Sequence, residues 1–410
     1  MLPGTPATLD QFQGMMMTTT PLPQSLQSKA ARSLVHLDLL GLLIAIVLTP
    51  LAQAQINPTP IAIDVHVHTS SKHYALLDDI LSSFGVTRFI NLSGGQPGNG
   101  LEESLSSARR FDGRIKVCVT LPWQEIDDPQ FFVRQADMLR RARSLGAACL
   151  KVSKALGLYV PDPTATDGLL AIDDKRMDAI WATAGALGMP VFIHTADPKA
   201  FFEPLDEHNE RLDELGLHPN WSFSNPRFPR RGALLEARNT VIRRHQKTKF
   251  IGVHFANNPE DPAVVDAWLD EMPNLYVDIA ARVPELGRHP PHAMRAFFEK
   301  HQDRILFGTD LGFSRGGIML GSVGRERPQI IDIFHFLGQH QQWLETQATN
   351  IEHPTPIQGR WRINAIGLPS DVLKKLYQTN ALKLFWQQDS HDMRDQQAVE
   401  SARGMPHYFE

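Results

Sequence analysis

A regular alternation of short apolar runs and longer amphipathic stretches extends over most of the chain. The runs are rich in β-branched residues and are predicted strands at Ile61–His68, Thr87–Asn91, Ile115–Thr120, Ala147–Val152, Pro190–His194, Lys249–His254, Asn274–Asp278 and Arg304–Gly308. Helices are predicted between and after them at Ser70–Phe84, Gly100–Phe111, Pro129–Leu145, Asp173–Leu187, Gly232–His245, Asp261–Glu271, Pro291–His301 and Ser370–Phe385. Strands that alternate with helices indicate parallel strands joined by helical crossovers. Eight such units predict an α/β fold, the closed (β/α)8 TIM barrel.

The alternative to a barrel is an open, doubly wound sheet. Such a sheet normally has a Gly-rich phosphate-binding turn after its first strand, whereas the first predicted strand here runs into His68-Thr69-Ser70. Two connecting loops are long: Thr195–Arg231 after the fifth strand, and Asp310–Pro369 after the eighth, with a predicted helix around Ile330–Leu344. Long loops at the strand ends of a barrel often carry function. We expect both loops to cover the active site, with surface decoration or an oligomer contact as the alternative.

The first 54 residues have a different composition. Residues 1–28 are rich in Thr, Pro, Gln and Met without a periodic apolar pattern, which predicts disorder. Lys29 and Arg32 then precede an apolar run, Leu39–Leu51, that ends in Leu51-Ala52-Gln53-Ala54, a small-x-small pattern. A basic start, a short apolar run and a small-residue end are typical of a secretory signal. We therefore expect export to the periplasm or the extracellular space, with an uncleaved anchor as the alternative.

This interpretation divides the chain into three parts. Residues 1–54 would be a disordered leader plus signal, residues 55–390 one barrel domain, and residues 391–410 a polar tail. The apolar run is shorter than a membrane span requires, so no stable span is expected after signal cleavage. The 41 basic and 45 acidic side chains give a formal net charge of −4. There is no basic run of the kind that binds nucleic acid.

Two cysteines, Cys118 and Cys149, lie within apolar strand-like runs. A thiol in such a run behaves as a small apolar side chain. A domain of this size does not need a disulfide to build a core. We therefore predict two buried free thiols.

The first predicted strand carries an unusual set of polar residues. Side chains alternate between the two faces of a strand, so Asp64, His66 and His68 share one face. Two imidazoles at positions i and i+2 can reach one ion, and neutral imidazole is a common ligand of divalent transition metals. The alternative is a half-exposed strand whose histidines have no special role.

Polar residues also fall at the carboxyl ends of later strands. They are Lys151, His194, His254, Asp278 and, just after the eighth strand, Asp310. The carboxyl ends of barrel strands share one face, where catalytic residues are found. Unpaired, these groups would suffer desolvation and mutual repulsion. A divalent cation would relieve both, so the pattern predicts a metal site.

With this set of residues the chain resembles the amidohydrolase superfamily. Within it, the chain is most similar to the amidohydrolase-related branch, which includes aminocarboxymuconate semialdehyde decarboxylase, resorcylate decarboxylases and lactone hydrolases. The resemblance covers about Ile61 to Trp386. It rests on His66-x-His68, His194, His254, Gly308-Thr309-Asp310 and the closing Leu373–Phe385 helix with Asn380-Ala381. It implies that His66, His68, His194 and Asp310 bind one metal ion, with zinc expected, and that His254 lies beside the metal-bound water or the substrate.

These residue types suit metal-assisted chemistry. A divalent ion lowers the pKa of water toward ~7. Asp310 is the expected general acid–base, and His254 is expected to polarise a carbonyl or stabilise an oxyanion. Asp64 is expected to be a buried partner of the metal-binding residues or of the barrel core rather than a metal ligand.

Three further residues are candidates for contacting the substrate. Lys151 either contacts the substrate or forms a salt bridge. If carboxylated, as a lysine at this strand is in two-metal members of the superfamily, it would bridge a second metal. Arg282 follows Asp278 and could hold a substrate carboxylate, since its guanidinium fork matches that group. A surface ion pair is the alternative, and Asn257 could line the mouth.

The sequence supports three functions. The first is a metal-dependent hydrolase acting on an amide, lactone or ester, and the alternative is a metal-dependent decarboxylase of an aromatic or related carboxylic acid. The third is a barrel that binds a ligand without catalysis, which the complete ligand set disfavours. A small-molecule substrate is expected in each case, with a homodimer as an option for assembly.

Overall fold

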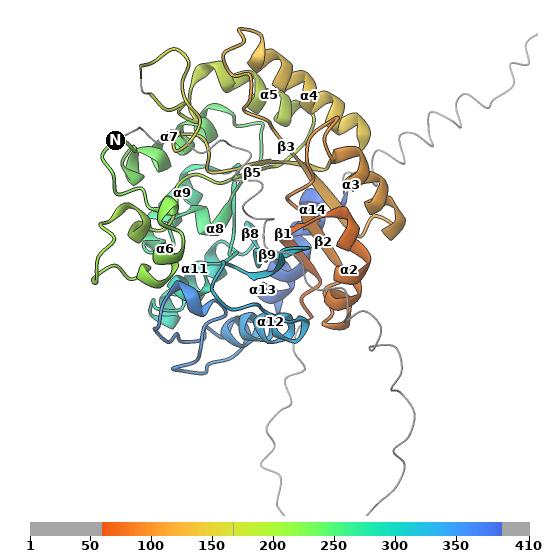
Figure 1. Cartoon of the computed structure of the whole chain (residues 1–410). Helices are drawn as coiled ribbons and strands as arrows, with labels where there is room; N and C mark the ends of the chain where they lie inside the picture. Colours follow the sequence, from red (N-terminus) through yellow and green to blue (C-terminus); the bar gives the residue numbers. More distant parts are fainter. Residues whose placement is uncertain (1–59, 167, 388–410) are drawn as a thin grey trace, which may run out of the picture.

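The eight parallel strands expected from the sequence are present in the computed structural model, which describes residues 60–166 and 168–387 (Figure 1). They are β1 (Ile63–Thr69), β2 (Arg88–Asn91), β3 (Ile115–Thr120), β4 (Cys149–Val152), β5 (Val191–Ile193), β6 (Phe250–Gly252), β7 (Leu275–Asp278) and β8 (Ile305–Leu306). Each strand pairs in parallel with the next. Every strand overlaps the apolar run that predicted it, which confirms the (β/α)8 fold.

The ring closes between its last and first strands. The amide of Val65 in β1 donates to the carbonyl of Phe307, just after β8, at 3.0 Å. The chain then continues into β9 (Leu311–Ser314), which pairs in parallel with the end of β1. β10 (Gly317–Leu320) returns antiparallel to β9. This hairpin in the long loop after the eighth strand was not predicted from the sequence.

Helices surround the strands (Figure 1). The helices that overlap predicted ones are α2 (Tyr74–Ser83), α3 (Leu101–Ala108), α4 (Phe131–Leu145), α5 (Asp178–Ala186), α7 (Arg231–Arg244), α9 (Pro262–Glu271), α11 (Pro291–Lys300), α12 (Ile330–Glu345), α13 (Ser370–Lys374) and α14 (Asn380–Phe385), the last two joined by a π-helical turn, η8 (Lys375–Thr379). Shorter elements in the loops are α6 (Leu212–Leu217), α10 (Val283–Leu286) and α8 (Val253–Ala256), the last of which has left-handed rather than α-helical backbone angles at His254 and Phe255.

The amino-terminal end of the barrel is closed by apolar packing. Ile63, Val65 and Phe192 lie inside the barrel in one buried cluster with Leu384 and Phe385 of α14. The rings of Phe192 and Phe385 stack with centroids 5.6 Å apart. Burying each of these large side chains contributes about 1.5–3 kcal/mol. The floor of the barrel is therefore filled, which leaves the carboxyl ends of the strands to form the site.

The two cysteines form a disulfide, so the prediction of free thiols was wrong. Cys118 on β3 and Cys149 on β4 are register partners on adjacent strands, with Cα atoms 4.4 Å apart. That separation lies within the range that a disulfide spans. Both residues are fully buried inside the barrel. The sequence showed that each lies in an apolar run but not that the two face each other.

The predicted leader and signal at residues 1–54 and the predicted polar tail at residues 391–410 lie outside the described residues. Within residues 60–166 and 168–387, no helix combines the length and apolar character needed to cross a bilayer.

Candidate functional site

The parallel strands bring the predicted polar residues to one mouth. His66 and His68 lie on β1, and Asp310 follows β8. Nitrogen or oxygen atoms of these three side chains lie within 4.8 Å of one another, close enough to share one ion. His254, which follows β6, forms a second such group with His66 and Asp278.

Asp310 lies between the two histidines of β1. Its Oδ1 is 3.5 Å from Nε2 of His66 and 3.4 Å from Nε2 of His68. Asp310 has a φ of +64°, a left-handed conformation that is uncommon for a non-glycine residue. Its amide donates to the carbonyl of His66 at 2.9 Å, which fixes this turn. A Cβ on Gly308 would lie 2.8 Å from the Cβ of His66, so glycine is needed there for the close approach.

Asp64 is a buried hydrogen-bond partner of the residues around this site, as expected from the sequence. Its carboxylate accepts hydrogen bonds from the His66 amide at 3.0 Å, the Thr309 amide at 3.2 Å and the Thr309 hydroxyl at 2.6 Å. It therefore joins β1 to the turn that carries Asp310. Burial raises the pKa of the Asp64 carboxyl to about 7, although these hydrogen bonds oppose the shift.

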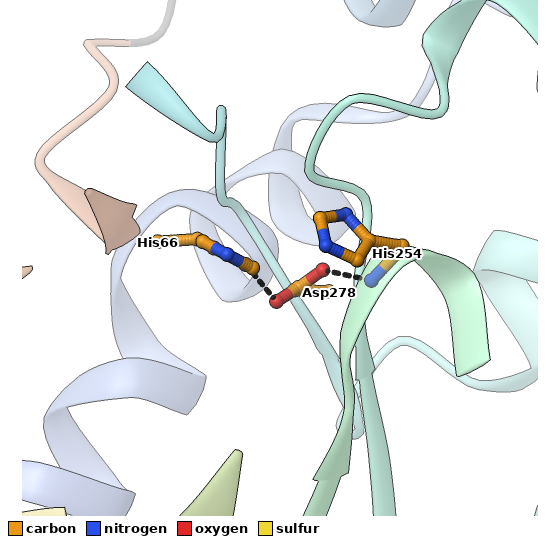
Figure 2. Close-up of side chains that lie close together, drawn as sticks. All are labelled: His66, His254 and Asp278. Carbon is orange, nitrogen blue, oxygen red and sulfur yellow. Dashed lines mark hydrogen bonds and ion pairs between the residues drawn. The ribbon is translucent and has the colours of Figure 1, made fainter. Parts of the chain in front are cut away.

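Asp278, at the end of β7, connects two of the histidines (Figure 2). Its Oδ2 is 2.8 Å from Nδ1 of His66, and its Oδ1 accepts from the backbone amide of His254 at 2.7 Å. A carboxylate beside Nδ1 favours the tautomer protonated at Nδ1 and leaves the Nε2 lone pair available. Nε2 of His66 is buried and has no hydrogen-bond partner among the described residues. The sequence placed Asp278 at a strand end, but it did not indicate this role.

His194, directly after β5, has a carboxylate partner that sequence reasoning missed. Its Nε2 lies 3.3 Å from Oδ1 of Asp197, and Asp197 also accepts from Nζ of Lys154 at 2.5 Å. The ring of His194 lies 4.6 Å from that of His254, which in turn lies 4.8 Å from that of His66, measured between centroids. His194 therefore lies at the edge of the site, where its ring packs against the ring of His254. The sequence did contain one sign of this contact, because Asp197 lies three residues after His194.

The four histidines are held neutral. Burial is the largest cause in each case, and it lowers the pKa of His68 to about 3 and of His194 to about 4. It also lowers the pKa values of His66 and His254 well below the ordinary value. Burial raises the pKa of Asp310 to about 7. Neutral imidazoles and a carboxylate, with one buried imidazole nitrogen lacking a partner, fit the donor set of a divalent transition metal.

Lys151 and Arg282 are buried near the carboxylates of Asp278 and Asp310, but neither forms an ion pair among the described residues. Lys151 is buried, and its Nζ has no hydrogen-bond partner among the described residues. Burial lowers the pKa of Lys151 to about 8, against the opposing charges of Asp278 and Asp310. Arg282 is also buried; it donates to the carbonyl of Ala281 at 2.7 Å, and its Nε has no partner in the described part of the chain.

The backbone after β6 forms a left-handed turn. His254, Phe255, Ala256 and Asn257 all have φ between +51° and +56°. Such a conformation costs about 1–2 kcal/mol for each L-residue that is not glycine. Gly252 allows the turn to fold back, since a Cβ there would lie 2.9 Å from the Cβ of Ala256. Asn257 is fully buried and its Oδ1 accepts from the Thr195 amide at 3.1 Å, so it joins the ends of β5 and β6.

Buried ion pairs and hydrogen bonds join the two long loops. Arg211, from the loop after β5, is fully buried and donates to Glu214 at 2.8 Å and to Glu285 of α10. Glu214 also accepts from the hydroxyl of Ser322, which lies in the loop after β8. His218 contacts the carbonyl of Val323 at 3.0 Å. The loops therefore pack as one ordered layer with the loop after β7.

Comparisons with known proteins relate this arrangement to one family. The family model described as Amidohydrolase matches residues 63–386. A comparison with curated proteins finds no match.

Among solved structures, a TIM-barrel protein from Bordetella bronchiseptica is 13% identical with a TM-score of 0.44, over 76% of this chain and 82% of that one. A 2,6-dihydroxybenzoate decarboxylase from Rhizobium is 15% identical with a TM-score of 0.42, over 79% and 97%. A 4-oxalomesaconate hydratase from Rhodopseudomonas palustris is 11% identical with a TM-score of 0.43, over 83% and 99%.

Proposed function

Because the chain belongs to the amidohydrolase family, we propose that it is a metal-dependent hydrolase that cleaves an amide, lactone or ester bond of a small molecule. One observation carries the proposal. The buried Nε2 of His66 has no hydrogen-bond partner among the described residues and lies beside His68 and Asp310, within the distance at which one ion can be shared. A buried imidazole nitrogen without a partner is costly unless a ligand occupies the space in front of it.

We assign His66, His68, His194 and Asp310 as the residues that would hold one divalent ion, with zinc as the expected metal. The ion would supply a Lewis acid that lowers the pKa of water and polarises a carbonyl. His194 belongs to neither of the two groups of close donor atoms found among the described residues, and its Nε2 faces Asp197. Its other ring nitrogen, Nδ1, is the atom that we expect to reach the ion.

Asp310 is assigned to proton transfer. Its carboxyl lies 3.5 Å from Nε2 of His66 and 3.4 Å from Nε2 of His68, the two imidazoles that would hold the ion. From that place it can accept a proton from the attacking water and return it to the leaving group.

His254 is assigned to orienting the nucleophile. Its Nδ1 lies 2.9 Å from the carbonyl of Ala280, so Nδ1 carries the proton and Nε2 has a free lone pair. A neutral ring in this tautomer accepts a hydrogen bond from water.

The buried cations favour a substrate that carries an acidic group. Neither Lys151 nor Arg282 has an ion-pair partner within the described residues. A substrate carboxylate would supply the missing negative charge. The same observation favours the second candidate function, decarboxylation of an aromatic or related carboxylic acid, because there the carboxylate is also the reacting group.

One experiment separates the two reactions. Purified protein with a measured metal content is incubated with esters, lactones and amides, and with aromatic carboxylic acids. Release of an acid from the first set, lost after chelation, supports the hydrolase. Release of carbon dioxide from the second set, without hydrolysis, establishes the decarboxylase instead. Binding of members of either set without turnover would contradict both.

A further inference from the structure

Two arginines of α7 hold the left-handed turn that presents His254. Arg231 and Arg238 are seven residues apart and so lie on one face of the helix. Arg238 donates through Nη1 to the carbonyl of Ala256. Arg231 donates through Nη2 to the carbonyl of Asn257 at 2.7 Å. The helix therefore contacts two successive carbonyls of the turn that follows β6.

Arg238 is the more unusual of the two. It is fully buried, and no carboxylate lies within ion-pair distance of it among the described residues. Its Nε and Nη2 donate to Oδ1 of Asn239, at 3.1 Å and 2.8 Å, and its guanidinium lies 4.7 Å from the ring of Trp268. A buried charge is expensive when it has no ion pair. The negative ends of carbonyl groups and the face of an aromatic ring are what compensate it here.

The opposite side of the same turn is held by the loop that follows β7. Asp278 accepts from the amide of His254, and the carbonyl of Ala280 lies 2.9 Å from the His254 ring. The turn is thus fixed from both sides, by α7 on one and by the end of β7 on the other. Released from α7, four residues in a left-handed conformation would relax toward the favoured right-handed or extended regions. The backbone that carries the imidazole would then change direction.

We propose that Arg238 is a positioning residue: its guanidinium, by binding the carbonyl of Ala256, keeps residues 254–257 left-handed and thereby keeps the His254 imidazole at the mouth. The inference rests on the proposed function in one respect, because it takes His254 as a residue that contacts the substrate or its attacking water. The geometry of the turn does not depend on that assignment.

The first test needs no substrate. Hydrogen–deuterium exchange is measured on the peptide that spans residues 253–258 in wild type, in Arg238→Gln and in Arg243→Gln. Arg243 lies on the same helix but pairs at the surface with Glu236 and Glu271, so its variant controls for loss of an arginine from α7. We expect faster exchange in Arg238→Gln alone. Equal exchange in the two variants would overturn the proposal.

The second test is kinetic. Arg238→Gln is expected to lower kcat by about 10²-fold, as displacement of a catalytic group by an ångström does. The loss should disappear when Arg238→Gln is introduced into His254→Asn, because the residue that Arg238 positions is then already absent. Losses that multiply in the double variant would show that Arg238 acts on general stability and would overturn the proposal.

Arg238→Lys keeps the test decisive if Arg238→Gln does not fold. Lysine retains the charge but lacks the fork that reaches Ala256 and Asn239 together, so we expect faster exchange and a lower kcat than in wild type. Exchange and kcat equal to wild type in Arg238→Lys, with Arg238→Gln unfolded, would overturn the proposal. If His254→Asn itself leaves kcat unchanged while exchange in Arg238→Gln rises, the proposed role of His254 in the reaction fails, whereas the hold of Arg238 on the turn is supported.

Discussion

Nδ1 of His66 lies 2.8 Å from Oδ2 of Asp278, and both side chains are fully buried. The pair joins β1 to β7 and leaves Nε2 of His66 facing Asp310. A carboxylate that orients a histidine in this way makes the ring a better metal ligand. The other oxygen of Asp278 accepts from the His254 amide, so one carboxylate fixes the ring of His66 and the backbone of His254.

Asp278→Asn is therefore expected to weaken metal binding by about 10–100-fold, the usual effect of losing such a partner. A chelator competition titration measures it. Asp266→Asn is the matched control, since Asp266 contacts the imidazole of His301 at 2.6 Å, away from the mouth. Equal metal affinity in Asp278→Asn and Asp266→Asn would contradict the assignment.

Purified protein is expected to bind close to one equivalent of divalent metal, and the metal should be lost in His66→Ala and in His194→Ala. Elemental analysis of dialysed protein measures the content. Lys151→Met should leave it unchanged. A content near two that falls in Lys151→Met would instead indicate a carboxylated lysine and a second ion. Full turnover after complete removal of metal would refute the metal site.

Asp310→Asn should retain the fold and much of the metal, but lower turnover by ~10²-fold or more, the size expected for loss of general acid–base assistance. Turnover and metal content are measured on the same preparation. Near-normal turnover with full metal would move proton transfer to His254.

The same variant has an expected signature in metal-free protein. Because burial raises the pKa of Asp310 from 3.8 to about 7, the folded state holds a proton that the unfolded chain releases between these values. Asp310 therefore lowers stability progressively as the pH rises from about 4 to 7, and constantly above 7. Asn cannot ionise, so metal-free Asp310→Asn should unfold at a higher temperature than wild type at pH 8 and at a similar temperature at pH 4. A difference that does not change with pH would contradict the assigned pKa.

The disulfide between Cys118 and Cys149 closes a loop with a sequence separation of 31. A loop of this length is expected to contribute about 3–4 kcal/mol to the free energy of unfolding. The thermal midpoint of wild type should fall with reductant, whereas that of Cys118→Ala/Cys149→Ala should not respond. Titratable thiols in the unreduced, denatured protein would show that the bond is absent. Disulfides persist mainly outside the cytosol, so the bond is compatible with the export predicted from residues 1–54.

The sequence by itself determined the barrel. Each strand was visible as a short β-branched run, because the pattern that buries a parallel strand on both faces is local. It also placed His66, His68, His194, His254 and Asp310 at one mouth, because parallel strands share the direction of their carboxyl ends. These predictions needed no knowledge of which side chains touch.

Only the tertiary structure decided the partners. The His66–Asp278 contact joins residues 212 positions apart, and the two cysteines meet because β3 and β4 take one particular register. The left-handed turn at His254 depends on carbonyl contacts from α7, which lies before it in the chain and carries no local signal for them. Local propensity opposes that turn, since L-residues avoid positive φ. Contacts between distant segments supply the free energy that holds it, and no window of sequence contains them.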